Sequence, residues 1–133
     1  MSEIAEKRVI SKQEIKKLNK KYKSLSLVDR IKTLYKDFDE TEVMVTSSFA
    51  ATSAFLLKLF SEVNTEQVIY FIDTGYHFEE TLSYKNQLIE TYNLKVKSVS
   101  ALKHEHEFTT KDKTWIKNPD FCCSINKVKP LEV

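Results

Sequence analysis

The chain has 133 residues, of which 41% are hydrophobic and 30% charged, and this length and composition fit one soluble globular domain and exclude a disordered or fibrous protein. A net charge of +2 is too small to indicate a nucleic-acid-binding surface, so neither DNA nor RNA is an expected partner. No apolar run reaches the roughly 20 residues of a membrane helix, and residues 1–10 lack the apolar centre of a secretory signal. We therefore expect a cytoplasmic protein without membrane contact.

Two helical patterns open the chain. Ser11 and Glu14 have the spacing of a capping box, and Ser26 and Asp29 repeat that signal ahead of apolar residues at helical spacing. The expected helices span residues 11–22 and 26–37, within an N-terminal helical segment of residues 1–40.

From Glu42 onward, short apolar runs alternate with segments of helical pattern. Continuous apolar strands alternating with helices are typical of a parallel sheet with helices on both faces and right-handed crossovers. Residues 41–133 are therefore predicted to form an α/β domain. The expected strands are Val43 to Val45, Val68 to Ile72 and Lys95 to Val99, and the expected helices are Ala50 to Ser61 and Phe78 to Tyr92.

The last third of the chain has a weaker pattern. Residues 102–117 are polar without a clear period, which predicts a loop with short helical turns in which His104 and His106 are solvated. A zinc site that joins these histidines to the cysteines is disfavoured, because their spacing is not a standard ligand pattern. Residues 121–128 are predicted to form a short helix that ends before Pro130.

Two predicted loops follow strands at the edge where parallel sheets bind ligands, at the crevice where strand order reverses. Residues 46–49 offer hydroxyls and backbone N–H groups at a helix N-terminus, a natural seat for an anion, although hydroxyl residues also cap helices for purely structural reasons. Residues 73–76 hold the only glycine of the chain, Gly75, which indicates a tight or positive-φ turn. Neither loop has the glycine-rich fingerprint of a P-loop or a dinucleotide-binding fold.

Cys122 and Cys123 are the chain's two cysteines. Adjacent cysteines cannot easily form a disulfide with each other, so they are interpreted as reduced thiols or metal ligands. A buried apolar patch around Phe121 is the alternative, because free cysteine behaves as a small hydrophobic residue.

Three stretches, in this order and spacing, resemble the sulfonucleotide reductase family, which reduces adenylyl sulfate (APS) or phosphoadenylyl sulfate (PAPS). They are Thr46 to Phe49, then Tyr70 to Thr81 with its Asp-Thr-Gly-Tyr sequence, then Cys122-Cys123 followed by Lys127-Val128-Lys129-Pro130-Leu131. The double cysteine with Lys-Val-x-Pro-Leu is the most specific of the three. The resemblance runs from about Val43 to Leu131.

This resemblance implies an adenine nucleotide α-hydrolase-like fold, incomplete at its C-terminal end, in a protein of sulfate assimilation and cysteine biosynthesis. The implied reaction yields sulfite and AMP or PAP, with thioredoxin or glutaredoxin as reductant. The substrate-binding residues that it implies are Ser47, Ser48 and Phe49 near the sulfate–phosphate end, Asp73, Thr74 and Gly75 by the nucleoside, and Lys127 between cluster and substrate.

The same resemblance implies a [4Fe–4S] cluster, for which Cys122 and Cys123 match the first two ligands. The second cysteine pair and the catalytic cysteine of the family have no counterpart in this sequence. Ala50 stands where the family often has glycine and Asn126 where it usually has arginine, and no arginine follows Arg30. Because arginine is the usual bidentate partner of phosphate and sulfate, we expect weaker anion binding than in the full family.

Two hypotheses remain from the sequence. The chain is either a truncated sulfonucleotide reductase whose activity needs further sequence, or a shortened relative that binds an adenine nucleotide without turnover or completes itself with a partner chain, for instance as a homo-oligomer. A thiolating or adenylating enzyme of the same superfold is disfavoured, because no glycine-rich pyrophosphate loop surrounds Ser47.

Overall fold

The computed structural model describes residues 9–132, which form two compact units that divide between Asp37 and Phe38. The expectation about a secretory signal in residues 1–10 falls mostly outside these residues. No helix among the described residues is long and apolar enough to cross a bilayer.

The first unit is a pair of helices, α1 (Lys12–Lys23) and α2 (Leu27–Asp37), which confirms both predicted helices. The hydroxyl of Ser11 accepts a hydrogen bond from the Glu14 N–H, as the capping pattern predicts. Asp37 joins the two helices, because its carboxylate accepts hydrogen bonds from Lys21 at 2.9 Å and from the Tyr22 hydroxyl at 2.8 Å. Burial, followed by this hydrogen bond, raises the pKa of Tyr22 to about 12.

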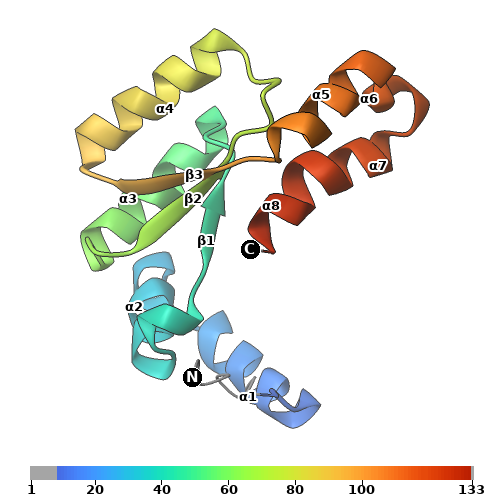
Figure 1. Cartoon of the computed structure of the whole chain (residues 1–133). Coiled ribbons are helices and arrows are strands. Elements are labelled where there is room, and N and C mark those ends of the chain that lie inside the picture. The colour runs from blue at the N-terminus through green and yellow to red at the C-terminus, as the bar shows by residue number, and fades with distance from the viewer. Residues whose placement is uncertain (1–8, 133) are drawn as a thin grey trace, which may run out of the picture. The chain divides into compact units, whose positions relative to one another are not determined.

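The second unit is built on a parallel sheet of order β1-β2-β3 (Figure 1). The strands are β1 (Val45–Ser47), β2 (Val68–Ile72) and β3 (Lys95–Val99), so the last two predicted strands are confirmed. The first strand begins two residues later than predicted. A 3₁₀ turn capped by Asp39 spans Glu40–Glu42, and the N–H of the next residue, Val43, donates to the Glu40 carbonyl. Pairing between strands therefore starts only beyond Val43.

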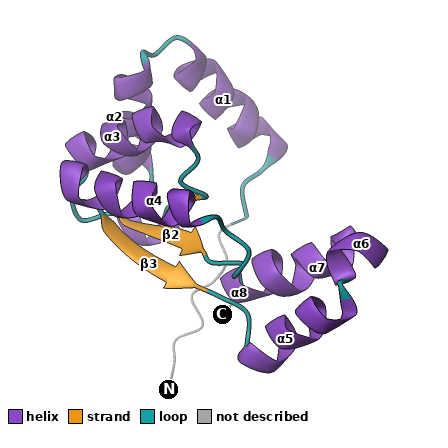
Figure 2. Ribbon diagram, turned by 90° about the horizontal axis from the view of Figure 1, so that it is seen from above, coloured by secondary structure: helices purple, strands orange, loops and turns teal. Residues whose placement is uncertain are grey.

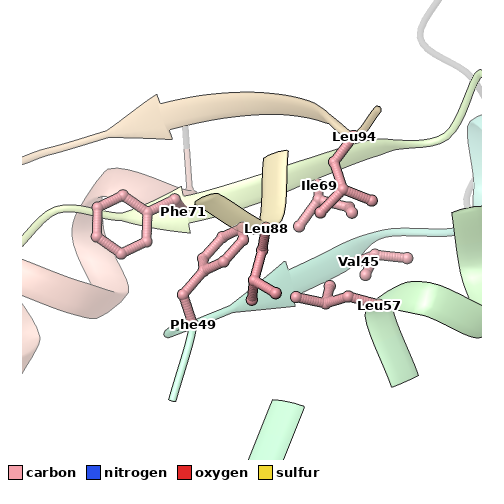
Figure 3. Packing of buried hydrophobic residues seen from close by; sticks show 7 residues of the cluster. All are labelled: Val45, Phe49, Leu57, Ile69, Phe71, Leu88 and Leu94. Carbon is pink, nitrogen blue, oxygen red and sulfur yellow. The ribbon is translucent and has the colours of Figure 1, made fainter. Parts of the chain in front are cut away.

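One face of this sheet carries the core. Register pairs Val45 with Ile69 and Ser47 with Phe71, and the connecting helices α3 (Ala54–Val63) and α4 (Glu79–Tyr92) both pack onto that face. Figure 2 shows α4 lying along β2 and β3. The buried cluster in Figure 3 consists of Val45, Phe49, Leu57, Ile69, Phe71, Leu88 and Leu94.

The predicted parallel α/β sheet is thus confirmed, with helices bordering both of its faces. Because β1, β2 and β3 follow one another without reversal, both crossovers lie on the same face, and the described strands contain no point where strand order reverses. The other face, which bears Tyr70, is bordered instead by the start of α5 and by α8 along an open groove.

The region predicted as a loop is helical. It forms α5 (Lys103–Asp112) and α6 (Thr114–Lys117), separated by the left-handed residue Lys113. The prediction was wrong because the buried residues of these helices are the polar Thr109 and Thr114, so the sequence shows no apolar period. The Thr109 hydroxyl donates to the His106 carbonyl, and the Thr114 hydroxyl donates to the Asp112 carboxylate.

The final helical segment is longer than predicted. It runs through α7 (Pro119–Cys123), a π-helical stretch (Ser124–Val128) and α8 (Lys129–Leu131). The predicted stop before Pro130 was wrong, because the backbone stays helical from the π-helical stretch through Pro130 to Leu131.

Candidate functional site

The loop after β1 turns sharply at Phe49. This residue has a left-handed backbone (φ 55), and its N–H donates to the Ser47 hydroxyl at 3.0 Å. The Phe49 side chain is 1% exposed and packs edge-on against Phe71, with ring centroids 5.7 Å apart. A ligand at this loop would therefore meet the Phe49 backbone and the exposed Ser48 rather than the Phe49 ring.

The helical segment beyond this loop begins with a 3₁₀ turn. The 3₁₀ turn Ala51–Ser53 and helix α3 both begin without a side-chain cap. Ser47 does use its hydroxyl structurally, for the turn at Phe49. The Ser53 and Ala54 N–H groups donate to the Ala50 and Ala51 carbonyls, so only the N–H groups before them can face solvent or a ligand.

The loop after β2 is held by its own side chains. The Asp73 N–H donates to the Val99 carbonyl at 2.8 Å, and one Asp73 carboxylate oxygen accepts from the Gly75 N–H at 2.9 Å. The Thr74 hydroxyl is buried and accepts from the Tyr76 N–H at 3.3 Å. Gly75 has φ 75, which confirms the positive-φ turn expected of the lone glycine.

The two cysteines occupy different environments on α7. Cys122 is buried and Cys123 is exposed, and both are free thiols. The apolar-patch alternative therefore suits Cys122 only. Lys127 lies in the π-helical stretch with its side chain exposed, and it forms no ion pair within residues 9–132.

A buried polar network connects the loop after β2 to the cysteine helix. Asn126, 2% exposed, donates to the Cys122 carbonyl at 3.0 Å and to the Thr109 hydroxyl at 3.2 Å. The Thr109 hydroxyl lies 2.8 Å from the Tyr76 hydroxyl. His106 completes the network, with its Nδ1 3.1 Å from the Asn126 side-chain oxygen and its ring 4.8 Å from that of Tyr76.

Sequence reasoning missed this network. It placed His106 in a solvated loop and gave Thr109 no role, yet His106 is partly buried and Thr109 is fully buried. The sequence held no signal for it, because the residues concerned, Thr109, Thr114 and Asn126, are polar and yet are buried by the fold. Polar residues are rarely buried unless they are hydrogen-bonded, so their burial could be read only from the tertiary structure.

The structure thus brings some predicted site residues together and leaves others apart. Register pairs Ser47 with Phe71, two residues before Asp73, so both loops lie at the carboxyl edge of the sheet. Cys122 is tied to the second loop through Asn126. Among the described residues, Lys127 forms no recorded hydrogen bond with any predicted site residue.

A hollow in the second unit lies elsewhere, on the sheet face opposite the core. It is an open groove of about 870 Å³, lined among others by Tyr70, Lys97, Val99, Leu102 and Leu131. An ion pair between Lys129 and Glu105 joins α8 to α5 beside it. None of the predicted site residues lines this groove, so its walls are not those of the predicted nucleotide site.

The sequence matches the family model of the phosphoadenosine phosphosulfate reductase domain over residues 42–133. It is 35% identical over 114 residues to an adenosine 5'-phosphosulfate reductase of Mesorhizobium japonicum, covering 82% of this chain and 42% of that protein. It is 34% identical over 105 residues to one of Bacillus cereus, covering 74% of this chain and 43% of that protein. The chain therefore spans less than half the length of these relatives.

The fold is similar to a crystal structure of phosphoadenylyl-sulfate reductase from Candida auris in complex with phosphate. The TM-score is 0.76 with 26% sequence identity, and the match covers 94% of this chain and 62% of that one. The similarity thus includes nearly the whole chain but only part of the solved protein.

Proposed function

Because this chain belongs to the phosphoadenosine phosphosulfate reductase domain family, we propose that it supplies the nucleotide-binding part of a sulfonucleotide reductase. The reaction reduces adenylyl sulfate or phosphoadenylyl sulfate to sulfite and AMP or PAP, with thioredoxin or glutaredoxin as reductant. The observation that carries this proposal is that Asn126 joins the cysteine helix to the loop at Asp73–Tyr76, at the sheet edge where parallel folds bind ligands. A reductant-dependent reaction of this kind also favours the cytoplasm, where thiols stay reduced.

The two loops take different parts of the substrate in this proposal. The uncapped helix start after Ser47 and Ser48 offers N–H groups and a positive helix end to the sulfate–phosphate group. The loop of Asp73, Thr74 and Gly75 takes the nucleoside, with one Asp73 oxygen committed to the turn and the other open to the ligand. Exposed Lys127 adds a mobile positive charge for the anionic end.

The cysteines do not by themselves fit an iron–sulfur cluster. A [4Fe–4S] cluster takes four thiolates, whereas this chain has two cysteines, and residues 9–132 contain no group of three or more potential metal ligands. No chemical step is therefore assigned to a cluster. We propose that Cys122 and Cys123 supply two thiolates to a cluster completed by cysteines of another polypeptide or of a second copy of this chain.

A non-catalytic nucleotide-binding protein is the second candidate function. The observation that favours it is that both cysteines of the chain lie at one place, side by side in α7, where they are the proposed cluster ligands. No further thiol is present in the chain to attack the sulfur of the substrate. In this version the nucleotide is bound and not reduced.

Both candidate functions require the chain to bind an adenine nucleotide, so nucleotide binding is tested first. Isothermal titration of the purified chain with AMP, APS and PAPS should give saturable binding of at least one. The Asp73→Ala variant, which removes the turn-forming carboxylate, should weaken that binding about tenfold, equivalent to about 1.4 kcal/mol. The control Glu90→Ala, an exposed change on α4, should leave it unchanged.

Absence of binding to all three nucleotides would rule out both versions for this chain. Preference for APS over PAPS, or the reverse, identifies the substrate. Anaerobic reconstitution with iron and sulfide then separates the candidates. Iron content with a visible charge-transfer band that is lost in Cys122→Ser and Cys123→Ser supports a shared cluster and the reductase, whereas a colourless protein that binds AMP supports the second candidate.

A further inference from the structure

Asn126 has a single possible orientation in its buried site. Its side-chain nitrogen faces two acceptors, the Cys122 carbonyl at 3.0 Å and the Thr109 hydroxyl at 3.2 Å. Its oxygen must therefore face His106 Nδ1 at 3.1 Å, which fixes the hydrogen of the neutral imidazole on that nitrogen. No described buried side-chain N or O atom lacks a hydrogen-bond partner. The amide is thus locked on both sides.

Two connections run from Asn126 to the loop after β2, and they are joined to each other because the Thr109 hydroxyl donates to the His106 carbonyl at 2.8 Å. In the first, the Thr109 hydroxyl lies between the amide and the Tyr76 hydroxyl, at 3.2 Å and 2.8 Å. In the second, the His106 ring packs directly against Gly75. A movement of the loop therefore has to displace the partners of Asn126 as well.

On its other side, Asn126 contacts one of the two cysteines. Its side-chain nitrogen lies 3.6 Å from the Cys122 sulfur, in addition to its hydrogen bond to the Cys122 carbonyl. Cys122 is 7% exposed, whereas Cys123, the next residue, is exposed and forms no recorded contact with this network. The chain thus contains one thiol in contact with the network, that of Cys122, and beside it a second thiol outside the network, that of Cys123, which serves as a control.

We propose that Thr109 and Asn126 are positioning residues that couple the loop at Asp73–Tyr76 to the Cys122 thiol, so that ordering of the loop closes access to Cys122 and not to Cys123. A reagent reaches a buried thiol only when the structure opens locally. A ligand that binds only the closed loop stabilises the closed state by mass action. The rate at which a reagent modifies Cys122 should then fall, at most by a factor of one plus the ratio of ligand concentration to Kd. The identity of that ligand as an adenine nucleotide rests on the proposed function, while the coupling itself does not.

The first arm of the test uses no ligand. Alkylation by iodoacetamide is followed by mass spectrometry in the Cys123→Ser background for Cys122 and in Cys122→Ser for Cys123. Tyr76→Phe removes the loop hydroxyl, and Thr109→Val removes the connecting hydroxyl at nearly constant volume. Each should speed modification of Cys122 several-fold and leave Cys123 unchanged. Tyr92→Phe, a change on α4 away from the network, should affect neither thiol.

Folding of each variant is checked with Trp115, the only tryptophan. Its ring lies 5.4 Å from that of Tyr76, so its fluorescence also reports on the loop. If Cys122 reacts at the wild-type rate in both folded variants, or if both thiols accelerate equally, the coupling is overturned.

The second arm adds AMP at about nine times its measured Kd. Modification of Cys122 should slow by up to about tenfold, with no change at Cys123, and the effect should be lost in Thr109→Val. If AMP binds and Cys122 is not protected, the coupling is overturned. If AMP does not bind, the same measurement is made with APS or PAPS. If none of the three binds, the proposed function fails for this chain, and the ligand-free arm still decides the coupling.

Discussion

The His106 ring packs against Gly75 so closely that a Cβ at position 75 would lie 2.5 Å from the ring atom Cε1. Gly75 also has φ 75, a backbone conformation that residues with side chains rarely adopt. The lone glycine of the chain thus meets two requirements at once, the shape of the loop and the close approach of α5. Its position explains how a loop after β2 and a helix near residue 106 form one structure.

Gly75→Ala should therefore be costly. We expect a loss of about 2 kcal/mol or more in the free energy of unfolding, because the left-handed conformation costs an L residue about 1–2 kcal/mol and His106 must move as well. Urea denaturation of Gly75→Ala, His106→Ala and the double variant separates the backbone cost from the cost of displacing His106. In the His106→Ala background the Gly75→Ala change should cost less than in the wild type. Equal costs in both backgrounds would show that the contact with His106 is not a source of the effect.

A second left-handed residue offers the opposite change. Lys113 ends α5 with φ 52, and its N–H donates to carbonyls of the last helical turn. Lys113→Gly should stabilise the protein by roughly 1 kcal/mol, because glycine adopts this conformation without steric cost. Lys111→Gly, within the last turn of the same helix, should destabilise it by about 1 kcal/mol. Thermal unfolding should therefore give a higher melting temperature for Lys113→Gly and a lower one for Lys111→Gly. A Lys113→Gly variant that is no more stable than the wild type would contradict this explanation of the end of α5.

The sequence was sufficient for the elements whose burial is apolar. Val68–Ile72 and Lys95–Val99 were predicted with the bounds that the structure has. The first is a continuous apolar run, as a strand inside a parallel sheet should be, whereas the second keeps only Val96 and Val99 partly buried. The helix α5 was not predicted, because its buried residue is Thr109 and its inner contacts are hydrogen bonds to other segments. Local pattern cannot reveal a helix that is stabilised by polar tertiary partners.

The candidate site divides in the same way. The turn at Gly75 followed from one residue, since a lone glycine after a strand predicts a positive φ. The bond between Tyr76 and Thr109 joins residues 33 positions apart, and nothing in either local sequence specifies the other. Phe49 was predicted on its motif to bind substrate, whereas its ring lies in the core and leaves only its backbone at the loop.

The core makes a prediction about Phe71. This side chain is 0% exposed at the centre of the sheet, with the rings of Phe49 and His77 beside it and the Lys85 ammonium 4.4 Å from its ring centroid. Phe71→Ala should cost about 3–5 kcal/mol of unfolding free energy, because it leaves a cavity against α4. Phe55→Ala, an exposed position on α3, should change stability by less than about 0.5 kcal/mol. Similar costs for the two variants in chemical denaturation would place the core elsewhere.

Acid should weaken the junction between α5 and α6 through Asp112. The pKa of Asp112 is held below its usual value of 3.8, first by the hydrogen bond from Lys117 at 2.9 Å and then by that from Thr114 at 3.0 Å. A folded-state pKa below the unfolded one means that this carboxylate stabilises the protein above about pH 4, and that its contribution is lost as the pH falls through the lowered value.

Asp112→Asn removes the charge at every pH. The variant should therefore melt at a lower temperature than the wild type at pH 7, and the gap between the two should narrow as the pH falls from 5 toward 2. Glu107→Gln, an exposed change on α5, is the control for a general effect of removing one negative charge. Because Thr114 is 2% exposed and donates its hydroxyl to Asp112, the loss reaches a buried residue rather than only a surface ion pair. A gap that stays constant across this pH range in thermal unfolding would mean that the protonation of Asp112 does not contribute to folding.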